Sequence, residues 1–393
     1  MVSARRRPAA SRPLASRKPT LVSITPVSAP PVRRTFVDDE RQEQFERDGF
    51  VVMPFLTDDD VAFFTQMVEE LYANPQDYFY KSAENFFTSA QNRPADPNFG
   101  RVHELVVERF RDRVAAQFDR YEIRHGYVMT KPPHSTVGVP VHQDEAFLDE
   151  SQSRGVLIWC PLVDTNAENG WLNVLVGSHT VLPLDRPTGH APWPFREVEE
   201  RLYHHLTPLE VKAGDVVAYD GALIHASPPN RSSVLRPTVG IGLAPEEAQL
   251  ICDFWVEDED RVDRYYVRPE FYVRHELGVQ PTSMYDRVEP RDWAPPVVTD
   301  ADLDRWYGPD PGEPPGFQPF MPREWERGNR EEFVAPPDDD PSASASEDED
   351  TGAASAEEAH RTEAAPPPAS AARRARRLAG KVKRRLIGPS TPS

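Results

Sequence analysis

The chain has few cysteines and no long apolar run. Its 393 residues include only Cys160 and Cys252, too few for a disulfide framework or a cysteine-based zinc site. This excludes a small secreted scaffold and favours a reducing compartment. No stretch approaches the roughly 18 consecutive apolar residues of a transmembrane helix, so no membrane span is expected. Hydrophobic residues make up 38% and the mean hydropathy is -0.61, so we expect part of the chain to stay outside the core.

Charged residues are distributed unevenly. The whole chain carries a net charge of -19, to which residues 1–36 contribute eight positive charges and residues 338–393 contribute one net negative charge. Residues 37–337 therefore carry -26. A body this acidic repels phosphates, so nucleic acid is not an expected partner.

Three segments at the ends have compositions typical of disorder. We predict a disordered basic arm at residues 1–36, a proline- and acid-rich linker at 296–370 and a basic tail at 371–393. The arm is arginine-rich and acid-poor like a mitochondrial transit peptide, but its prolines interrupt an amphipathic helix, so a cytoplasmic location is favoured. A short helix in the basic tail would carry a thin apolar stripe. We favour the interpretation of this tail as a solvated charge run. Contact with anionic lipid or an acidic partner is the alternative.

The middle of the chain, residues 37–295, is predicted to fold. It begins with a helix, a short strand and a second helix, in the segments DDERQEQFERDGF, VVMPFL and TDDDVAFFTQMVEELYANP. Seven short β-branched and aromatic runs follow, separated by turn-forming residues. They are YEIRHGYVMT, GVPVHQ, RGVLIWCPLVD, WLNVLVG, LEVKAGDVVAYD, ALIHAS and PTVGIGLA. Short strands without helices between them predict an all-β core, either a sandwich or a barrel.

The histidines point to a metal site. Among eleven histidines, only His142 is followed two residues later by an acid, Asp144. Residues i and i+2 of a strand face the same way, so the imidazole and the carboxylate would project together. One such triplet is expected by chance in a chain of this length. A second segment, ALIHAS, strengthens the prediction because it places His225 at the end of another apolar strand.

Two histidines and one carboxylate form a ligand set with open positions. Such a set suits Fe(II) and oxygen chemistry better than closed structural zinc. An α-keto acid would fill two of the open positions and O2 the third. The second carboxylate of such a cosubstrate needs a fixed cation. Arg236 offers a planar fork for it, and the Ser227 hydroxyl would add one hydrogen bond.

These residues carry a resemblance to a known family. The segments YVMTKPP, HQD, IWCPLVDTNAENGWLNVLVGSH and AGDVVAYDGALIHASPPNRSS, followed by Arg236, resemble the phytanoyl-CoA dioxygenase family of Fe(II)/2-oxoglutarate oxygenases. DGFVVMPFLTDDDV is similar to the N-terminal supporting segment of that family. The resemblance covers about residues 40–250. It departs from the family's pattern at NGWLNVLVGSH, and nothing beyond residue 250 resembles the family.

The resemblance implies a fold, a site and a reaction. The implied fold is a double-stranded β-helix, the cupin-like jelly-roll barrel, with supporting N-terminal helices. His142, Asp144 and His225 would hold Fe(II), and Arg236 and Ser227 would bind 2-oxoglutarate. Trp159 and Tyr127 would line the cosubstrate pocket. The implied activity is hydroxylation of an unactivated C–H bond of a small molecule with O2, releasing succinate and CO2.

Two other classes of function stay open at this point. One is a catalytically silent barrel that acts as a binding or scaffold protein through its charged tails. The other is a metal-dependent cupin-type lyase or dioxygenase that does not use 2-oxoglutarate, against which Arg236 argues.

Several other residues have a structural and a functional interpretation. A structural role is favoured for His179, and a surface position for His204 and His205. Lys131 is expected to shape a turn near the mouth of the site. The aromatic run at 253–275 is expected to pack on the outer face of the barrel or at an oligomer contact, with a deep apolar pocket as the alternative. A loop at 181–200 lies where a lid would lie, and four of its residues would suit an anionic substrate: Arg186, His190, Trp193 and Arg196.

Overall fold

The computed structural model describes most of residues 33–313. All described residues belong to the first of two compact units, Met1–Phe333. Predictions for residues 1–32 and 314–393 therefore lie outside the described residues. The internal residues that are also not described are 74–78, 83–85, 90–98, 136–137, 182–184, 190, 193, 257–258, 276–278, 282–284, 289 and 295, and side chains are not described for 72–99 and 274.

The folded part opens with the predicted helix, strand and helix. Helix α1 (Asp39–Asp48) is capped by the Asp38 side chain, which accepts a hydrogen bond from the Arg41 amide at 2.9 Å. It ends at Gly49, whose φ of 85° is in the left-handed region. Strand β1 (Phe50–Pro54) and helix α2 (Asp58–Ala73) follow. A third helix, α3 (Phe99–Gln117), was not anticipated from the sequence.

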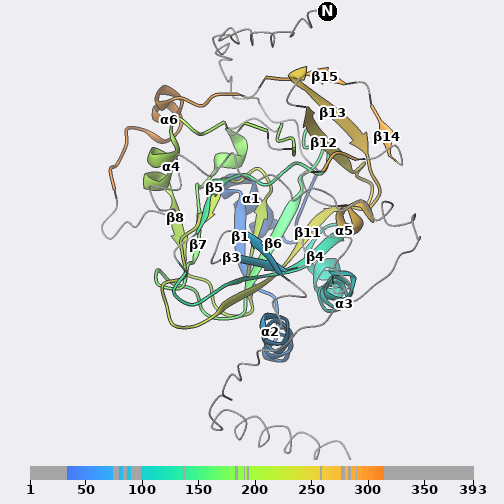
Figure 1. Cartoon of the computed structure of the whole chain (residues 1–393), viewed down its shortest axis with the longest axis vertical. Coiled ribbons are helices and arrows are strands. Elements are labelled where there is room, and N and C mark those ends of the chain that lie inside the picture. Colours follow the sequence, from blue (N-terminus) through green and yellow to red (C-terminus); the bar gives the residue numbers. More distant parts are fainter. Residues whose placement is uncertain are drawn as a thin grey trace, which may run out of the picture. The chain divides into compact units, whose positions relative to one another are not determined.

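A seven-stranded sheet forms the larger half of the β core (Figure 1). Its strand order is β1-β9-β6-β11-β4-β3-β2, and every neighbouring pair is antiparallel. The register between β11 and β4 places Arg236 opposite Lys131. The strands are β9 (Asp215–Asp220), β6 (Val156–Pro161), β11 (Arg236–Pro245), β4 (Tyr121–Lys131), β3 (Phe86–Ser89) and β2 (Phe79–Ser82).

A four-stranded antiparallel sheet faces the larger one. Its order is β5-β10-β7-β8, with β5 (Val139–His142), β10 (His225–Ser227), β7 (Leu172–Val174) and β8 (Thr207–Leu209). Leu172 and Val174 of this sheet share one buried cluster with Trp159 and Val217 of the larger sheet. All seven predicted strands are therefore present. Both sheets are open in their hydrogen bonding, so the β core consists of two facing antiparallel sheets.

Helices cover the outer faces of both sheets. Alternate residues of β6 divide between two clusters: Ile158 packs outward with helix residues such as Phe64 and Phe110, and Trp159 points inward. On the other side, α4 (Glu199–His205) and α6 (Asp300–Tyr307) cover the smaller sheet, as Figure 1 shows. Among the described residues between β7 and β8, α4 is the only α-helix. The 3-10 turn Ser178–Thr180 is the other helical segment there.

The aromatic run at 253–275 packs partly into the inner core. It contributes to β12 (Ile251–Val256), β13 (Arg261–Tyr266) and α5 (Phe271–Arg274). The rings of Tyr265 and Phe271 belong to the same inner cluster as Trp159. For these two residues the expected outer-face packing is wrong, because their rings close the inner core. Trp255 packs instead in a separate cluster with Trp293, and Tyr266 is 46% exposed. Two short strands, β14 (Asp286–Arg287) and β15 (Arg291–Asp292), complete a third sheet.

The predicted boundaries of the folded part are too narrow at both ends. Phe36, assigned to the disordered arm, is fully buried and bridges to Phe118. The predicted linker from residue 296 begins with ordered structure, since Val298 and, on α6, Leu303 are both buried in one cluster with Leu202 of α4. A polar segment can still be ordered when its few apolar side chains pack against another part of the folded protein. No helix among the described residues is long and apolar enough to cross a bilayer.

Candidate metal centre

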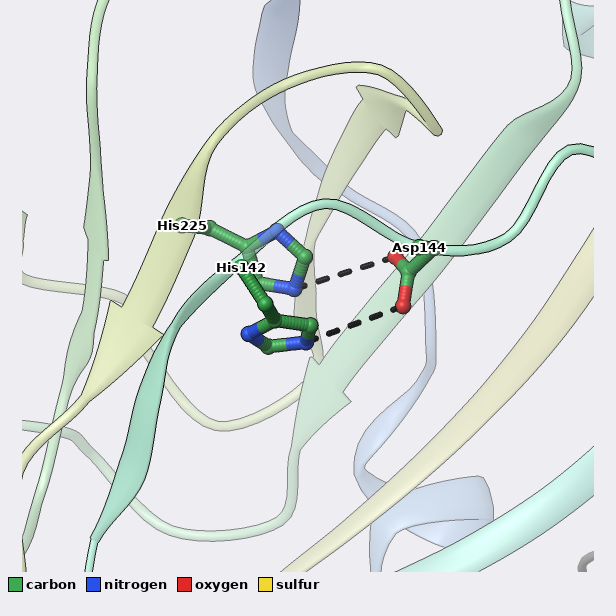
Figure 2. A group of neighbouring side chains, drawn as sticks. All are labelled: His142, Asp144 and His225. Atoms are coloured by element: carbon green, nitrogen blue, oxygen red, sulfur yellow. Dashed lines mark ion pairs between the residues drawn. The ribbon is translucent and has the colours of Figure 1, made fainter. Parts of the chain in front are cut away.

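Two histidines meet because their strands pair. The register between β10 and β5 places His225 opposite His142, with the ring centroids 4.2 Å apart. Figure 2 shows both rings turned toward the carboxylate of Asp144. Strand β5 ends at His142, so Asp144 lies on the following loop and not on the strand as the i and i+2 argument assumed.

The three side chains form a compact cluster. His142 Nε2 lies 3.8 Å from Asp144 Oδ1, and His225 Nε2 lies 3.7 Å from Asp144 Oδ2. One ligand atom from each residue falls within 4.8 Å of the others. Distances of this size leave room for an ion between the three atoms, since each bond to a metal is about 2.0–2.2 Å.

Backbone carbonyls set the orientation of both rings. His142 Nδ1 lies 2.8 Å from the Pro140 carbonyl oxygen, and His225 Nδ1 lies 3.0 Å from that of Leu223. Nδ1 must donate in both contacts, which leaves each Nε2 lone pair free for a metal. Burial, followed by the neighbouring His142, lowers the pKa of His225 to about 4. A neutral imidazole at pH 7 is the form that binds a metal.

A buried network holds the loop that carries Asp144. The Tyr219 hydroxyl donates to Asp144 Oδ2 at 3.1 Å. Arg186 Nε donates to the Asp144 carbonyl oxygen at 2.6 Å. Its two terminal nitrogens donate to the Glu150 carboxylate at 2.8 and 2.7 Å. The guanidinium expected to bind an anionic substrate is therefore engaged within the protein.

Arg236 is a buried cation in need of an anion. Its side chain is 1% exposed, and its guanidinium lies 5.5 Å from the centre of the Trp159 ring. Nε and Nη1 meet no hydrogen-bond acceptor among the described residues. Burial lowers the pKa of Arg236 to about 9. Burial of a guanidinium without hydrogen-bond acceptors destabilises the folded protein, unless the carboxylate of a ligand accepts its hydrogen bonds.

Lys131 lies beside Arg236 and corrects the sequence prediction. It is fully buried at the end of β4 and shapes no turn. Its ammonium donates to the Ser227 hydroxyl at 2.6 Å, to the Ser227 carbonyl at 2.8 Å and to the Pro228 carbonyl. Burial and the charge of Arg236 lower its pKa well below the usual value. Ser227 in turn donates to the Gly170 carbonyl at 2.9 Å, so its hydroxyl proton is already used.

The remaining predicted pocket residue, Tyr127, lies inside the core. It is 4% exposed and stacks on His125 with ring centroids 5.9 Å apart. Both rings lie over glycines of β11. A Cβ on Gly240 would come within 2.3 Å of the Tyr127 ring, and one on Gly242 within 2.2 Å of the His125 ring. These two glycines make space for the large inward side chains of β4.

The other histidines and the predicted lid divide between support and surface. His179 is buried and its Nε2 donates to the Glu46 carbonyl at 3.2 Å, the structural role expected of it. His204 and His205 are not free surface residues: His204 contacts Asp310 at 2.9 Å, and the His205 ring lies 5.8 Å from that of Tyr307 in a tilted arrangement. Arg196 is exposed, while His190 and Trp193 lie outside the described residues.

Sequence reasoning overlooked several residues at this site. Tyr219 precedes the DG turn, and its inward direction follows from its alternation with Val217 on β9. Lys131 shares the inward face of β4 with Tyr127. The alternation of side chains along a strand would have indicated this, because the two residues are an even number of positions apart. Glu145 follows Asp144 and is exposed, yet desolvation and the charge of Asp144 raise its pKa to about 7. No periodicity could have indicated Glu145, because it lies on a loop.

The described residues bring together two facing antiparallel sheets, a His-Asp-His cluster and a buried arginine whose Nε and Nη1 meet no acceptor. Residues 45–238 match the model of the phytanoyl-CoA dioxygenase (PhyH) family. This confirms the resemblance seen in the sequence.

Individual relatives share parts of the chain. A phytanoyl-CoA dioxygenase domain-containing protein 1 homolog from Dictyostelium discoideum is 35% identical over 101 residues, which are 24% of this chain and 36% of the relative. Phytanoyl-CoA dioxygenase 1 from Oryza sativa subsp. japonica is 29% identical over 203 residues, 44% of this chain and 70% of that protein. The chain thus spans about a third of the length of the first relative. Among solved structures, EctD from S. alaskensis with 2-oxoglutarate and 5-hydroxyectoine aligns with a TM-score of 0.43 and 22% identity, covering 62% of this chain and 87% of that one.

Proposed function

We propose that this protein is an Fe(II)- and 2-oxoglutarate-dependent oxygenase that hydroxylates an unactivated C–H bond of a small organic molecule. The observation that carries the proposal is the cluster of His142, Asp144 and His225 with a buried, acceptor-free Arg236 in the same core. The family match over residues 45–238 supports it. The two facing sheets are consistent with a double-stranded β-helix.

Different residues of the site would bind the metal and the cosubstrate. His142, Asp144 and His225 would hold the metal through two Nε2 atoms and one carboxylate oxygen. Arg236 would bind the distal carboxylate of 2-oxoglutarate, with Trp159 as an apolar wall beside it. When bound, the metal and cosubstrate would supply the O2-dependent oxidation, with release of succinate and CO2.

The surroundings of the cluster would keep this site ordered and partly dry. Tyr219 and Arg186 orient Asp144 from both ends of the residue, through its carboxylate and its carbonyl. The rings of Tyr127, Tyr219 and Trp159 are all less than 7% exposed, so little water reaches the inner face of the site. Exclusion of water protects a reactive site from side reactions.

The proposal is tested by anaerobic titration of the metal-free protein with Fe(II) and then 2-oxoglutarate, following the visible charge-transfer band. We expect the band in the wild type. His225→Ala should abolish it, because one of three ligands is lost. Arg236→Gln should require roughly 10- to 100-fold more 2-oxoglutarate, since it removes a charge-assisted contact worth about 1.5–3 kcal/mol.

Two controls separate these effects from damage to the fold. His134→Asn changes an exposed histidine in the left-handed region, which asparagine tolerates, and should leave the titration unchanged. Arg236→Lys keeps a positive charge and should fall between wild type and Arg236→Gln. Iron binding without a band would contradict the use of 2-oxoglutarate, and absence of iron binding would contradict the metal site itself.

A further inference from the structure

Lys131 is a buried basic group to which the proposed reaction gives no role. Its side chain is 0% exposed at the end of β4, and the register between β4 and β11 sets it directly opposite Arg236. Directly opposed residues of an antiparallel pair project to the same face, with their Cβ atoms about 4.5–5.5 Å apart. Two basic side chains therefore lie next to each other in the core.

The contacts of Lys131 require its charged form. Nζ donates to the Ser227 hydroxyl, the Ser227 carbonyl and the Pro228 carbonyl. The hydroxyl is the acceptor in the first contact, because it donates its single proton to the Gly170 carbonyl. Three acceptors need three N–H groups, and only the ammonium form of lysine has three. A Cβ on Gly170 would lie 3.2 Å from Nζ, so this ammonium is closely surrounded by protein.

No carboxylate among the residues that the structure describes pairs with either cation. Nε and Nη1 of Arg236 meet no acceptor at all, and every contact of Lys131 is to an uncharged oxygen. Burial, followed by the charge of Arg236, lowers the pKa of Lys131. Two like charges buried side by side destabilise the folded protein, and a bound anion relieves both the desolvation and the repulsion. The pair is therefore suited to an anionic ligand.

Ser227 does not supply the second contact to such a ligand that its position in the sequence suggested. Its only proton is donated to Gly170, so it has none to offer a carboxylate. The nearby positive charge of Lys131 remains. In a protein interior, a charge attracts an opposite charge over several ångströms, because little water screens the interaction. Lys131 therefore attracts a carboxylate that is bound at Arg236, although its own N–H groups are all in use.

We propose that Lys131 is the second cation of the 2-oxoglutarate site, and that it makes the site selective for α-keto acids that carry a distal carboxylate. The proposal rests on the proposed function, because it takes Arg236 as the residue that binds this carboxylate. Arg236 contacts the carboxylate directly, and Lys131 contributes its charge at a distance. The hydrogen bonds of Lys131 also hold Ser227 and Pro228 in place beside the site.

The test compares two α-keto acids of equal chain length, 2-oxoglutarate and 2-oxopentanoate, which lacks the distal carboxylate. Each is titrated without oxygen into the full-length protein with Fe(II) bound, and the visible charge-transfer band gives its dissociation constant. The ratio of the two constants measures what the distal carboxylate contributes. We expect the wild type to bind 2-oxoglutarate at least about 100-fold more tightly than 2-oxopentanoate, since two cations act on the carboxylate.

Two uncharged variants of Lys131 test its share of this ratio. Lys131→Met keeps an unbranched apolar stem and removes the charge. Lys131→Gln also removes the charge, but keeps two N–H donors for the carbonyls of Ser227 and Pro228. We expect either variant to reduce the ratio about tenfold or more by weakening 2-oxoglutarate, while the constant for 2-oxopentanoate stays nearly unchanged.

Two control variants separate the charge from the packing. Val128→Ala removes buried volume from the opposite face of the same strand, where Val128 is 0% exposed, and should keep the wild-type ratio. Lys212→Met removes the charge of an exposed lysine and should also keep it.

The outcomes distinguish the proposal from the proposed function. A wild-type ratio in the Lys131 variants would overturn the proposal. Equal weakening of both keto acids in these variants would overturn it too, because a purely structural lysine affects the two ligands alike. Absence of the band with either keto acid in the wild type would instead count against the proposed function.

Discussion

Two buried histidines of this chain, His225 and His179, have different roles. Burial lowers the pKa of both His225 and His179 to about 4. His225 has its Nδ1 tied to a carbonyl and its Nε2 turned to Asp144, whereas His179 uses Nε2 to donate to Glu46. A Cβ on Gly49 would lie 2.5 Å from His179 Nδ1, so this ring is packed against backbone. The direction of the free nitrogen, and not the depth of burial, separates a candidate ligand from a structural histidine.

Protonation of His179 should make the protein sensitive to acid. The pKa of His179 is about 4 in the folded state and near 6.5 when unfolded, so the unfolded state binds the extra proton between these values. Its contribution to stability is complete above pH 6.5 and is lost as the pH falls toward 4. We expect the stability difference between wild type and His179→Leu to decrease by about 1.4 kcal/mol per pH unit in that range.

Urea denaturation at several pH values measures this difference. Only the slope with pH bears on the prediction, because His179→Leu also loses the hydrogen bond to Glu46 at every pH. The exposed His134→Asn should run parallel to wild type. Parallel curves for wild type and His179→Leu would contradict the prediction.

Among the elements, the loop between β5 and β6 depends on buried charge. Its Glu150 is gripped by Arg186, and both side chains are less than 9% exposed. Asp220 and Arg154 lie in the same buried network at 3.4 Å. This network joins the segment after β7 to the loop that carries Asp144, so the lid predicted at 181–200 contributes an anchor to the site.

Loss of Arg186 should therefore cost more than loss of a surface cation. Arg186→Leu leaves Glu150 buried without its partner, and removing one side of a buried pair costs about 3–5 kcal/mol. We expect a decrease of that size in the free energy of unfolding, together with weaker Fe(II) binding, because Asp144 loses its carbonyl contact. Chemical denaturation and metal titration measure the two effects.

Lys212→Met is the matched control for charge. Lys212 pairs with Asp164 at 3.0 Å, but the two side chains are 77% and 59% exposed. Exposed pairs contribute about 0–1 kcal/mol, so this variant should be nearly as stable as wild type. Equal losses in the two variants would show that the network around Arg186 does not stabilise the loop.

Across the whole molecule, both ends of the described chain close the core. Phe36 fills a position against Phe118 and Phe45, at ring centroid distances of 4.7 and 5.4 Å. At the other end, α6 covers the smaller sheet with Leu303, which is 1% exposed, and Arg201 of α4 pairs with Asp300 and Asp304. The folded unit thus extends past both predicted boundaries.

Truncating one side chain of α6 tests whether this helix belongs to the fold. Leu303→Ala should lower the free energy of unfolding by about 2–5 kcal/mol, as expected for a fully buried leucine. Ala301→Ser changes an exposed position of the same helix and should alter it by less than about 0.5 kcal/mol. Urea denaturation measures both. A Leu303→Ala variant as stable as Ala301→Ser would mean that α6 is dispensable.

Local patterns were sufficient for much of this fold. The apolar runs that become β6 and β9 and the turn residues between the strands act within a few residues, so they are visible in the sequence. Helix α3 was overlooked, although it packs against β4, the next strand along the chain. The cluster of His142, Asp144 and His225 was predicted from residue types, although Asp144 reaches it from a loop.

The sequence by itself determined which chemical groups this protein has: a histidine and an aspartate in a short motif, a second histidine far along the chain with an arginine eleven residues after it, and an acidic body between basic ends. Only the tertiary structure decided how they are used. The register that sets Arg236 against Lys131 and the burial that engages Lys131 with Ser227 both arise between segments far apart in the chain. Their charge states and partners depend on desolvation and on neighbours, and neither exists until the sheets and the C-terminal hairpin have packed together.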